Sequence, residues 1–339
     1  MPRRLRICIS VVFAAAILSF CAACASDDGI GVSDAWRGPI EGTFIQYQDW
    51  MMKMDARAWR RELDAMRRAG ISVVIIQWLQ MNDSRFIPSD GAALDPTRII
   101  LEYADRHGME VFIGLAYADL WWTRLRDERY LTLAAVTSIH VANEAWARYG
   151  GHRSFAGWYL PQELRDANYP SHYIDALRDF LKGLGDRCRA LSGGKRVVIS
   201  PSMSGLVAPD LFGRIYTSLL LGSGIDVVIF QDGVGARDWD KDLEPRVVPY
   251  FSAMRAACRT AGVAMWSDVE IFHHTGKRSG SEPASIERIK RQMAAESPFV
   301  SRFVMFDFFH YMSPYRGRAQ KNLYKDYLRE LAHPAGPSR

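Results

Sequence analysis

Residues 71–78 read ISVVIIQW, an almost unbroken run of β-branched residues. Polar side chains do not alternate with apolar ones in this run, so it is typical of a strand buried on both faces, as in a parallel sheet. The preceding residues 55–69 carry apolar side chains at helical spacing, with Asp55 as a potential N-cap and Gly70 as a stop. A helix followed directly by a doubly buried strand predicts an α/β fold.

The same alternation of strand-like and helix-like segments continues along the chain. The predicted strands are 42–47, 71–78, 109–117, 155–160, 196–200, 226–231, 263–269 and 302–308, and the predicted helices are 55–69, 95–108, 131–149, 172–191, 209–221, 244–261, 285–295 and 318–331. Eight strand–helix pairs match the usual size of a TIM barrel. We therefore expect one (β/α)8 barrel over residues 40–332 and a disordered tail over 333–339. No Gly-x-Gly-x-x-Gly motif follows the first strand, which disfavours a dinucleotide-binding sheet.

The first residues, 1–24, have the features of a secretory signal peptide, because Arg3, Arg4 and Arg6 precede an apolar stretch. Two processing routes fit. In the route we favour, residues 21–24 (CAAC) are a bacterial lipoprotein box and Cys24 becomes the lipidated first residue. In the other, cleavage after Ala25 releases the protein. Residues 25–39 are polar and glycine-rich and would form a flexible tether. Both routes predict export, to the periplasm or to the cell envelope, the outer membrane included.

The composition disfavours several functional classes. Hydrophobic residues make up 48% and charged residues 24%, and the formal net charge of +5 falls to +2 without the three leader arginines. No basic stripe follows, so no nucleic-acid partner is expected. Cys188 and Cys258 fall in helical segments that are not consecutive, and we expect two buried free thiols. No Cys/His spacing typical of zinc occurs. We expect no metal or other cofactor, membrane contact only through a lipid anchor, and a monomer.

The side chains predicted at the carboxyl ends of the strands point to a ligand site. In a TIM barrel these ends form one rim, and here that rim is rich in acidic, amide and aromatic residues. Glu163 follows the fourth predicted strand and Glu270 follows the seventh. Paired carboxylates among aromatic rings suit cleavage of a glycosidic bond. The candidate substrate-binding residues are Gln46, Gln77, Trp78, Tyr117, Trp121, Trp122, Trp158, Gln162, Gln231, Asp232, Trp266, Asp268 and Tyr311.

Each of these residues also has a structural interpretation. Glu163 is a potential salt-bridge partner of Arg165, and Glu270 of His273 or Lys277. We expect Gln231 or Tyr311 to hydrogen-bond Glu270 and keep it ionised, with Asp268 as its main rival on the same strand face. Asp232 also fits an Asx-turn, and Asp307 fits a buried polar network. Most single tryptophans belong to a core, but two in one polar loop, Trp121 and Trp122, are difficult to bury together.

Four motifs resemble a known family. GTFIQ at 42–46, IIQW at 75–78, GWYLPQE at 157–163 and QDGVG at 231–235 look like a bacterial family classed as a domain of unknown function, which is itself similar to the clan A glycoside hydrolases. The resemblance covers about residues 40–330. It implies a (β/α)8 barrel and retaining hydrolysis, with the acid/base at Glu163 and the nucleophile at Glu270. The clan usually has Asn before the acid/base, whereas this chain has Gln162, so the residue contacting the sugar 2-hydroxyl is not defined.

Three functions remain open at this point. The leading one is an exported retaining glycosidase that cleaves an oligo- or polysaccharide with Glu163 and Glu270. The second is a non-catalytic carbohydrate-binding barrel of the cell envelope, which needs the aromatic rim but not two working carboxylates. The third is a metal-dependent hydrolase that uses His273, His274 and Asp268, although no Glu or His partner occurs at helical spacing from the two histidines.

Overall fold

The computed structural model describes residues 38–89, 91, 94–166, 173–275 and 280–333. The predicted signal peptide at 1–24, including Cys24, lies outside the described residues. So do all but two residues of the predicted tether at 25–39, and the predicted tail beyond residue 333.

Eight parallel strands close into a barrel, which confirms the predicted (β/α)8 TIM-barrel fold. In chain order they are β1 (Gly42–Ile45), β2 (Val73–Ile76), β5 (Glu110–Gly114), β7 (Phe155–Leu160), β8 (Arg196–Ile199), β9 (Val227–Gln231), β10 (Ala264–Glu270) and β13 (Phe303–Phe306). The barrel closes where β1 pairs with β13, with Gly42 opposite Val304. The fourth and seventh barrel strands are therefore β7 and β10, as the sequence predicted.

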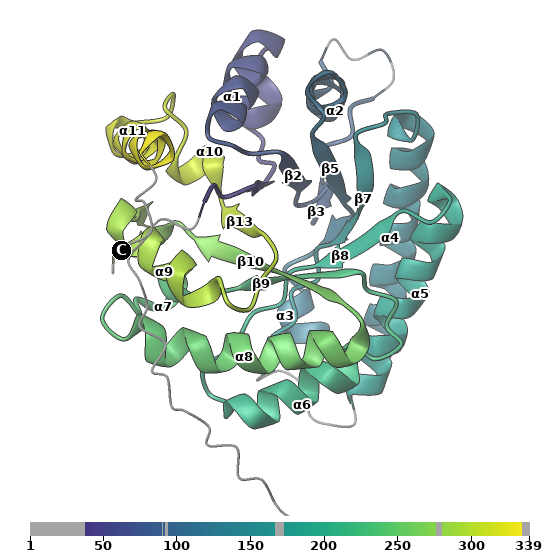
Figure 1. Ribbon diagram of the computed structural model, residues 1–339. Helices are drawn as coiled ribbons and strands as arrows, with labels where there is room; N and C mark the ends of the chain where they lie inside the picture. The colour runs from purple at the N-terminus through teal and green to yellow at the C-terminus, as the bar shows by residue number, and fades with distance from the viewer. Residues whose placement is uncertain (1–37, 90, 92–93, 167–172, 276–279, 334–339) are drawn as a thin grey trace, which may run out of the picture. The chain divides into compact units, whose positions relative to one another are not determined.

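Eight longer helices surround these strands (Figure 1). They are α1 (Ala56–Arg68), α2 (Pro96–His107), α4 (Glu128–Tyr149), α5 (Ile174–Ser192), α6 (Pro209–Leu220), α8 (Leu243–Ala261), α9 (Ile286–Glu296) and α11 (Arg318–Ala332). The predicted capping of the first helix is confirmed, since the Asp55 carboxylate accepts a hydrogen bond of 2.7 Å from the Ala58 amide. Of the helices that lie within the described residues, none combines the length and apolar character needed to cross a bilayer.

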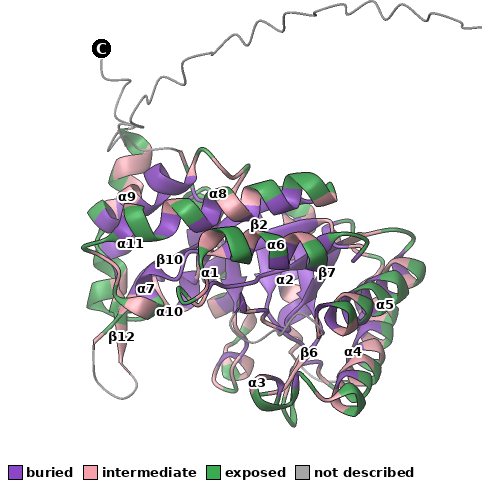
Figure 2. Ribbon diagram, turned by 90° about the horizontal axis from the view of Figure 1, so that it is seen from below, coloured by how far each residue is buried: buried purple, intermediate pink, exposed green. Residues whose placement is uncertain are grey.

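The barrel strands bury side chains on both faces. Inside the barrel, a small cluster includes Val73, Ile75, Tyr159 and Trp266, while the alternate residues of the same strands join the larger core under the helices. Figure 2 shows the buried strands at the centre and the exposed outer faces of the helices. This double burial explains why the strand sequences read as continuous apolar runs. Cys188 and Cys258 are buried in the outer core as free thiols.

Short elements lie in the connections that lead from a barrel strand to the next helix, and apart from β6, which falls inside the predicted strand 109–117, they were not predicted as separate elements. They are η1 (Met51–Lys53), β3 (Gln80–Met81), β4 (Ser84–Arg85), β6 (Ala116–Tyr117), α3 (Trp121–Arg124), α7 (Val234–Arg237), β11 (Phe272–His274), β12 (Ser281–Pro283) and α10 (Phe308–Tyr311). They are too short to show a periodic pattern in the sequence. Because these connections form the carboxyl-end rim of the barrel, the extra structure surrounds the predicted ligand site.

Candidate active site

A cavity of about 240 Å³ opens at the carboxyl ends of the strands, and both predicted catalytic glutamates line it. We call it the mouth cavity. Its lining residues are Phe44, Gln77, Tyr159, Glu163, Ser200, Gln231, Ala236, Asp268, Glu270, Phe272 and Phe306. Glu163 comes from the connection after β7 and Glu270 is the last residue of β10. The order of the strands in the barrel therefore brings two carboxyl groups that are distant along the chain into one cavity.

Glu270 is oriented by a backbone amide from the neighbouring connection. The Ala236 N–H donates a hydrogen bond of 2.6 Å to Oε2 of Glu270. Ala236 lies in α7, whose start is fixed by Asp232, because the Asp232 carboxylate accepts a hydrogen bond of 3.0 Å from the Val234 amide. Asp232 is fully buried and does not line the mouth cavity. The Asx-turn interpretation of Asp232 is therefore correct, and the predicted direct contact with substrate is not supported.

The glycines of the QDGVG motif let α7 approach β10. A Cβ atom at Gly235 would lie 2.1 Å from the Phe272 carbonyl oxygen, so no other residue fits there without displacing backbone. Gly233 has a φ of +67°, a left-handed conformation that favours glycine. These glycines bring the Ala236 amide to the carboxyl group of Glu270.

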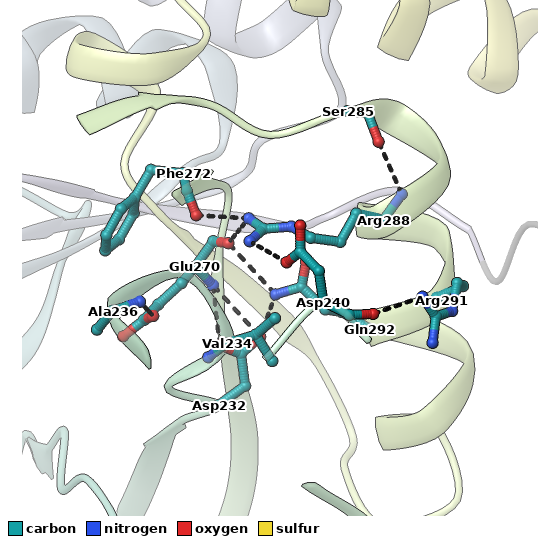
Figure 3. Close-up of polar contacts among 10 residues, drawn as sticks. All are labelled: Asp232, Val234, Ala236, Asp240, Glu270, Phe272, Ser285, Arg288, Arg291 and Gln292. Atoms are coloured by element: carbon teal, nitrogen blue, oxygen red, sulfur yellow. Dashed lines mark hydrogen bonds and ion pairs between the residues drawn. The ribbon is translucent and has the colours of Figure 1, made fainter. Parts of the chain in front are cut away.

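Helix α9 supports Glu270 from the other side with three polar residues on one buried face, and Figure 3 shows two of them, Arg288 and Gln292. The Arg288 guanidinium donates to the carbonyl oxygens of Glu270 and Phe272, at 2.7 and 2.6 Å. One turn later, Gln292 donates to the Asp232 carboxylate, and a further turn on, Glu296 pairs with the Ser267 hydroxyl. These three residues were not among the predicted site residues. Their spacing of i, i+4 and i+8 on an amphipathic helix is the signal that could have found them.

Glu163 has different partners. Its backbone carbonyl accepts a 2.7 Å hydrogen bond from the Trp121 indole, and its carboxyl group is hydrogen-bonded by Gln231. Burial raises the pKa of Glu163, and the Gln231 bond and the charges of Arg165 and Arg237 offset only part of that rise. A carboxyl group that holds its proton nearer to neutral pH suits a general acid.

The expected partners of Glu270 are therefore wrong. The Gln231 side chain hydrogen-bonds Glu163 instead, and it also donates to the Ser200 carbonyl oxygen, at 3.0 Å. Tyr311 stacks on Phe272 with ring centroids 4.9 Å apart, and it is not among the residues that line the mouth cavity. Of the predicted structural partners, Lys277 lies outside the described residues.

The carboxyl groups around the mouth cavity raise each other's pKa. Burial raises the pKa of Glu270 to about 8, and the charge of Asp232 contributes to that rise. Asp268, 2% exposed, has a pKa well above its usual value because of burial and then because of Glu270 and Asp232. Its Oδ2 accepts a 3.3 Å hydrogen bond from Ser200, while Oδ1 has no partner among the described residues. Both carboxyl groups therefore favour the protonated form, and hydrogen-bond donors on a ligand would favour the ionised form.

The aromatic residues of the mouth cavity are Phe44, Tyr159, Phe272 and Phe306, none of which was predicted as a site residue. None of the five tryptophans predicted to bind substrate (Trp78, Trp121, Trp122, Trp158 and Trp266) lines the mouth cavity. Trp158 points away from the barrel interior and donates to Ser192, and Trp266 is buried deep inside the barrel. Trp78 donates to the Tyr47 carbonyl oxygen.

The expectation that Trp121 and Trp122 are difficult to bury together is also wrong for Trp121. Trp121 is 1% exposed, so the two loop tryptophans are not both accessible, and short helix α3 packs it beneath the rim. Trp122 is half-buried under the Arg165 guanidinium, whose Cζ lies 5.3 Å from the ring centroid.

Of the remaining predicted residues, one lines the mouth cavity and two line a second cavity. Gln77 is buried and lines the mouth cavity, whereas Gln46 is half-buried and does not. Tyr117 and Gln162 line a second cavity of about 320 Å³, together with Trp121. Tyr117 also stacks on Trp78, with ring centroids 5.7 Å apart.

A metal centre finds no support in the described part of the chain. No three His, Cys, Asp or Glu side chains there are grouped so that they could hold a metal ion. The His274 ring lies on the β11–β12 hairpin and pairs with Ser281 at 3.0 Å, while Asp268 lies inside the barrel. Asp307 is fully buried and caps α10, where its carboxylate also pairs with the His310 ring at 2.7 Å. It forms the buried polar network that we expected.

The family described as "Domain of unknown function (DUF4434)" matches residues 40–317. Among solved structures, the fold is similar to that of a protein from Bacteroides thetaiotaomicron described as a "putative alpha-L-fucosidase", with a TM-score of 0.70 and 18% identity over 96% of this chain and 99% of that one. A beta-galacturonidase from Eisenbergiella tayi has a TM-score of 0.52 at 12% identity, over 87% of this chain and 52% of that one. A beta-D-glucuronidase from Dictyoglomus thermophilum has a TM-score of 0.51 at 14% identity, over 88% and 51%.

This chain therefore spans about half the length of the beta-galacturonidase and the beta-D-glucuronidase. At such identities these likenesses show a shared barrel fold and nothing about substrate. No curated protein matches the chain by sequence.

Proposed function

Because the chain belongs to the DUF4434 family, whose description assigns no activity, we propose its function from the site itself: a glycoside hydrolase of the retaining type. One observation carries the proposal. Glu163 and Glu270, from the fourth and seventh barrel strands, line the same cavity at the carboxyl-end rim. The glycosidase barrels among the similar structures are consistent with this chemistry but supply only the fold.

The proposed reaction has two steps. In the first, the Glu270 carboxylate bonds to the anomeric carbon while the glycosidic C–O bond breaks, and Glu163 gives its proton to the departing oxygen. In the second, Glu163 takes a proton from water, the water oxygen bonds to the same carbon, and the Glu270 carboxylate leaves. The proton is returned to Glu163, so the enzyme is regenerated. This mechanism requires the two carboxyl groups to lie about 5–5.5 Å apart when substrate is bound.

The partners of each glutamate fit these roles. The raised pKa of Glu163 favours the protonated acid that the first step needs. Glu270 must be ionised to attack; burial and the Asp232 charge raise its pKa to about 8, and the Ala236 amide offsets part of that rise. Asp268 and Gln77 line the same cavity, where hydroxyl groups of a sugar ring would complete their hydrogen bonds. The substrate would be an oligo- or polysaccharide.

The test is hydrolysis of a panel of aryl glycosides and envelope polysaccharides by the purified protein and by two variants. Glu163→Gln should lower kcat by about 10²–10⁴-fold. Glu270→Gln should abolish covalent labelling by a 2-deoxy-2-fluoroglycosyl fluoride, which peptide mass spectrometry would otherwise find on Glu270. Glu62→Gln is the matched control, because Glu62 is buried at α1 and does not line the mouth cavity. Inverted product configuration, or label on another residue, would refute the retaining mechanism.

A non-catalytic carbohydrate-binding barrel is the second candidate, and the pKa of Glu270 favours it. With that pKa raised to about 8, most of the Glu270 carboxyl groups are protonated at pH 7 and cannot attack. Calorimetry with the same polysaccharides separates the two functions. If the protein only binds glycan, the wild type and the Glu163→Gln variant should bind it equally well, and neither should hydrolyse it.

Export is also part of the proposal, and it rests on residues 1–24 alone. We propose lipidation at Cys24 and a location in the periplasm or at the cell envelope, where polysaccharide substrates are present. Labelling with radioactive palmitate in a bacterial host tests this, with cleavage after Ala25 as the competing outcome.

A further inference from the structure

A second cavity of about 320 Å³ lies beside the mouth cavity, and we call it the side cavity. Its residues come from β3 and β6 and the residues that follow each of them, from α3, from the first turns of α4 and, with Gln162, from the connection after β7. They are Gln80, Asn82, Asp83, Ala116, Tyr117, Ala118, Leu120, Trp121, Tyr130, Leu133, Ala134, Thr137 and Gln162.

Three observations link the side cavity to Glu163. Gln162, the residue before Glu163, is in its wall, and the Trp121 indole that lines it donates to the Glu163 carbonyl oxygen at 2.7 Å. Tyr117 lines it as well, and the Glu163 charge contributes to the raised pKa of the Tyr117 hydroxyl. A general acid protonates the oxygen of the leaving group, so the leaving group must lie on the Glu163 side of the scissile bond.

The chemistry of the side cavity selects the kind of leaving group. Leu120 and Leu133 are 58% and 61% exposed, so they present an apolar surface to a ligand. The polar groups are mostly uncharged, and no lysine or arginine is among the lining residues. Gln162 is 3% exposed, its Nε2 donates to the Ala116 carbonyl oxygen, and its Oε1 has no partner among the described residues. That oxygen can accept a hydrogen bond from a hydroxyl group.

We propose that the side cavity is the subsite for the leaving group, and that this group is a neutral sugar unit. A pyranose ring offers an apolar face to the two leucines and Tyr130, and hydroxyl groups to Gln162, Gln80 and Asn82. An anionic sugar would meet the Asp83 carboxylate without a lysine or arginine in the lining to pair with it. The inference rests on the proposed glycosidase function and adds that the substrate contains at least two sugars, the second of them uncharged.

The test compares two substrates that share the sugar selected by the glycoside panel. One is its neutral disaccharide, and the other is its glycosyl fluoride, whose leaving group is too small to fill the side cavity. Leu133→Glu should lower kcat/KM for the disaccharide by about tenfold or more and leave the glycosyl fluoride unaffected. Leu211→Glu is the matched control, because Leu211 is also exposed but lies on α6. Equal effects of Leu133→Glu on both substrates would overturn the proposal.

Two further results keep this inference distinct from the proposed function. If the protein hydrolyses nothing, calorimetry with neutral xylo-, manno- and gluco-oligosaccharides still tests the subsite. Weaker binding to the Leu133→Glu protein than to the Leu211→Glu protein supports a neutral-glycan site without catalysis, and unchanged or absent binding overturns it. If a uronic acid in the leaving-group position is cleaved or bound as well as the neutral sugar, the assignment of an uncharged unit is wrong.

Discussion

Replacing Glu270 by glutamine should stabilise the protein at alkaline pH. Glu270 is 6% exposed, and burial together with the Asp232 charge raises its pKa from 4.5 to about 8. Between these two values the folded protein holds a proton that the unfolded chain releases, so stability falls as pH rises. A shift of this size corresponds to roughly 5 kcal/mol above pH 8, at about 1.4 kcal/mol per pKa unit. Because neighbouring carboxyl groups titrate together with Glu270, part of this free energy belongs to them. We therefore expect Glu270→Gln to raise the free energy of unfolding by about 2–5 kcal/mol.

Urea unfolding followed by circular dichroism at pH 5, 7 and 9, at constant ionic strength, measures this gain. Glu270→Gln and the wild-type protein should differ little at pH 5, and the variant should become progressively more stable toward pH 9. The exposed Glu287 on α9 provides the control Glu287→Gln, which should show no such trend. A stability difference that does not change with pH would refute the reasoning, because it would mean that Glu270 has the same pKa in the folded and unfolded states.

The other predictions test the rest of the site. Since the proposed nucleophile Glu270 can attack only when ionised, kcat/KM should rise with pH toward about 8, and a flat profile across pH 6–8 would contradict this. Gly235→Ala should lower the free energy of unfolding by about 2 kcal/mol or more in thermal melts, whereas Gly183→Ala, in open space on α5, should not. Arg288→Lys cannot reach both carbonyl oxygens in the same way and should lower kcat more than it changes KM. Cys24→Ser should abolish labelling by palmitate.

The positions of the two glutamates were predictable because they depend on strand order alone. Counting apolar runs placed Glu163 after the fourth strand and Glu270 at the end of the seventh, and parallel strands present their carboxyl ends on one rim. The side chains that face the cavity were harder to predict. In FAGWYL both faces are buried, so the sequence does not show whether Trp158 or Tyr159 points inward. The choice of Trp158 was wrong because Tyr159, one residue later, faces the cavity.

Other features of the site could not be found from residue types at strand ends. The Ala236 group that contacts Glu270 is a backbone N–H, which any residue except proline supplies. Its position depends on a close approach of α7 to β10, and the trace of that approach in the sequence is the pair of glycines Gly233 and Gly235. Arg288 lies on a helix, away from every strand end, and is brought to Glu270 by packing of α9. Such contacts between distant segments leave little trace in local sequence.

Depth and hydrogen bonding favour Glu270 over Asp268 as the proposed nucleophile. Both side chains point into the barrel, but Asp268 is two residues earlier on β10 and therefore about 7 Å deeper along the strand. A buried carboxyl group without full partners destabilises a fold, and an apolar residue there would avoid that cost. Asp232, which is buried away from the cavity, has donors from Val234 and Gln292. Asp268, which lines it, has Ser200 as its one side-chain donor among the residues that the structure describes. An incomplete set of donors beside an open cavity is what a group that binds sugar hydroxyls requires, so Asp268 fits substrate binding and Glu270 fits attack.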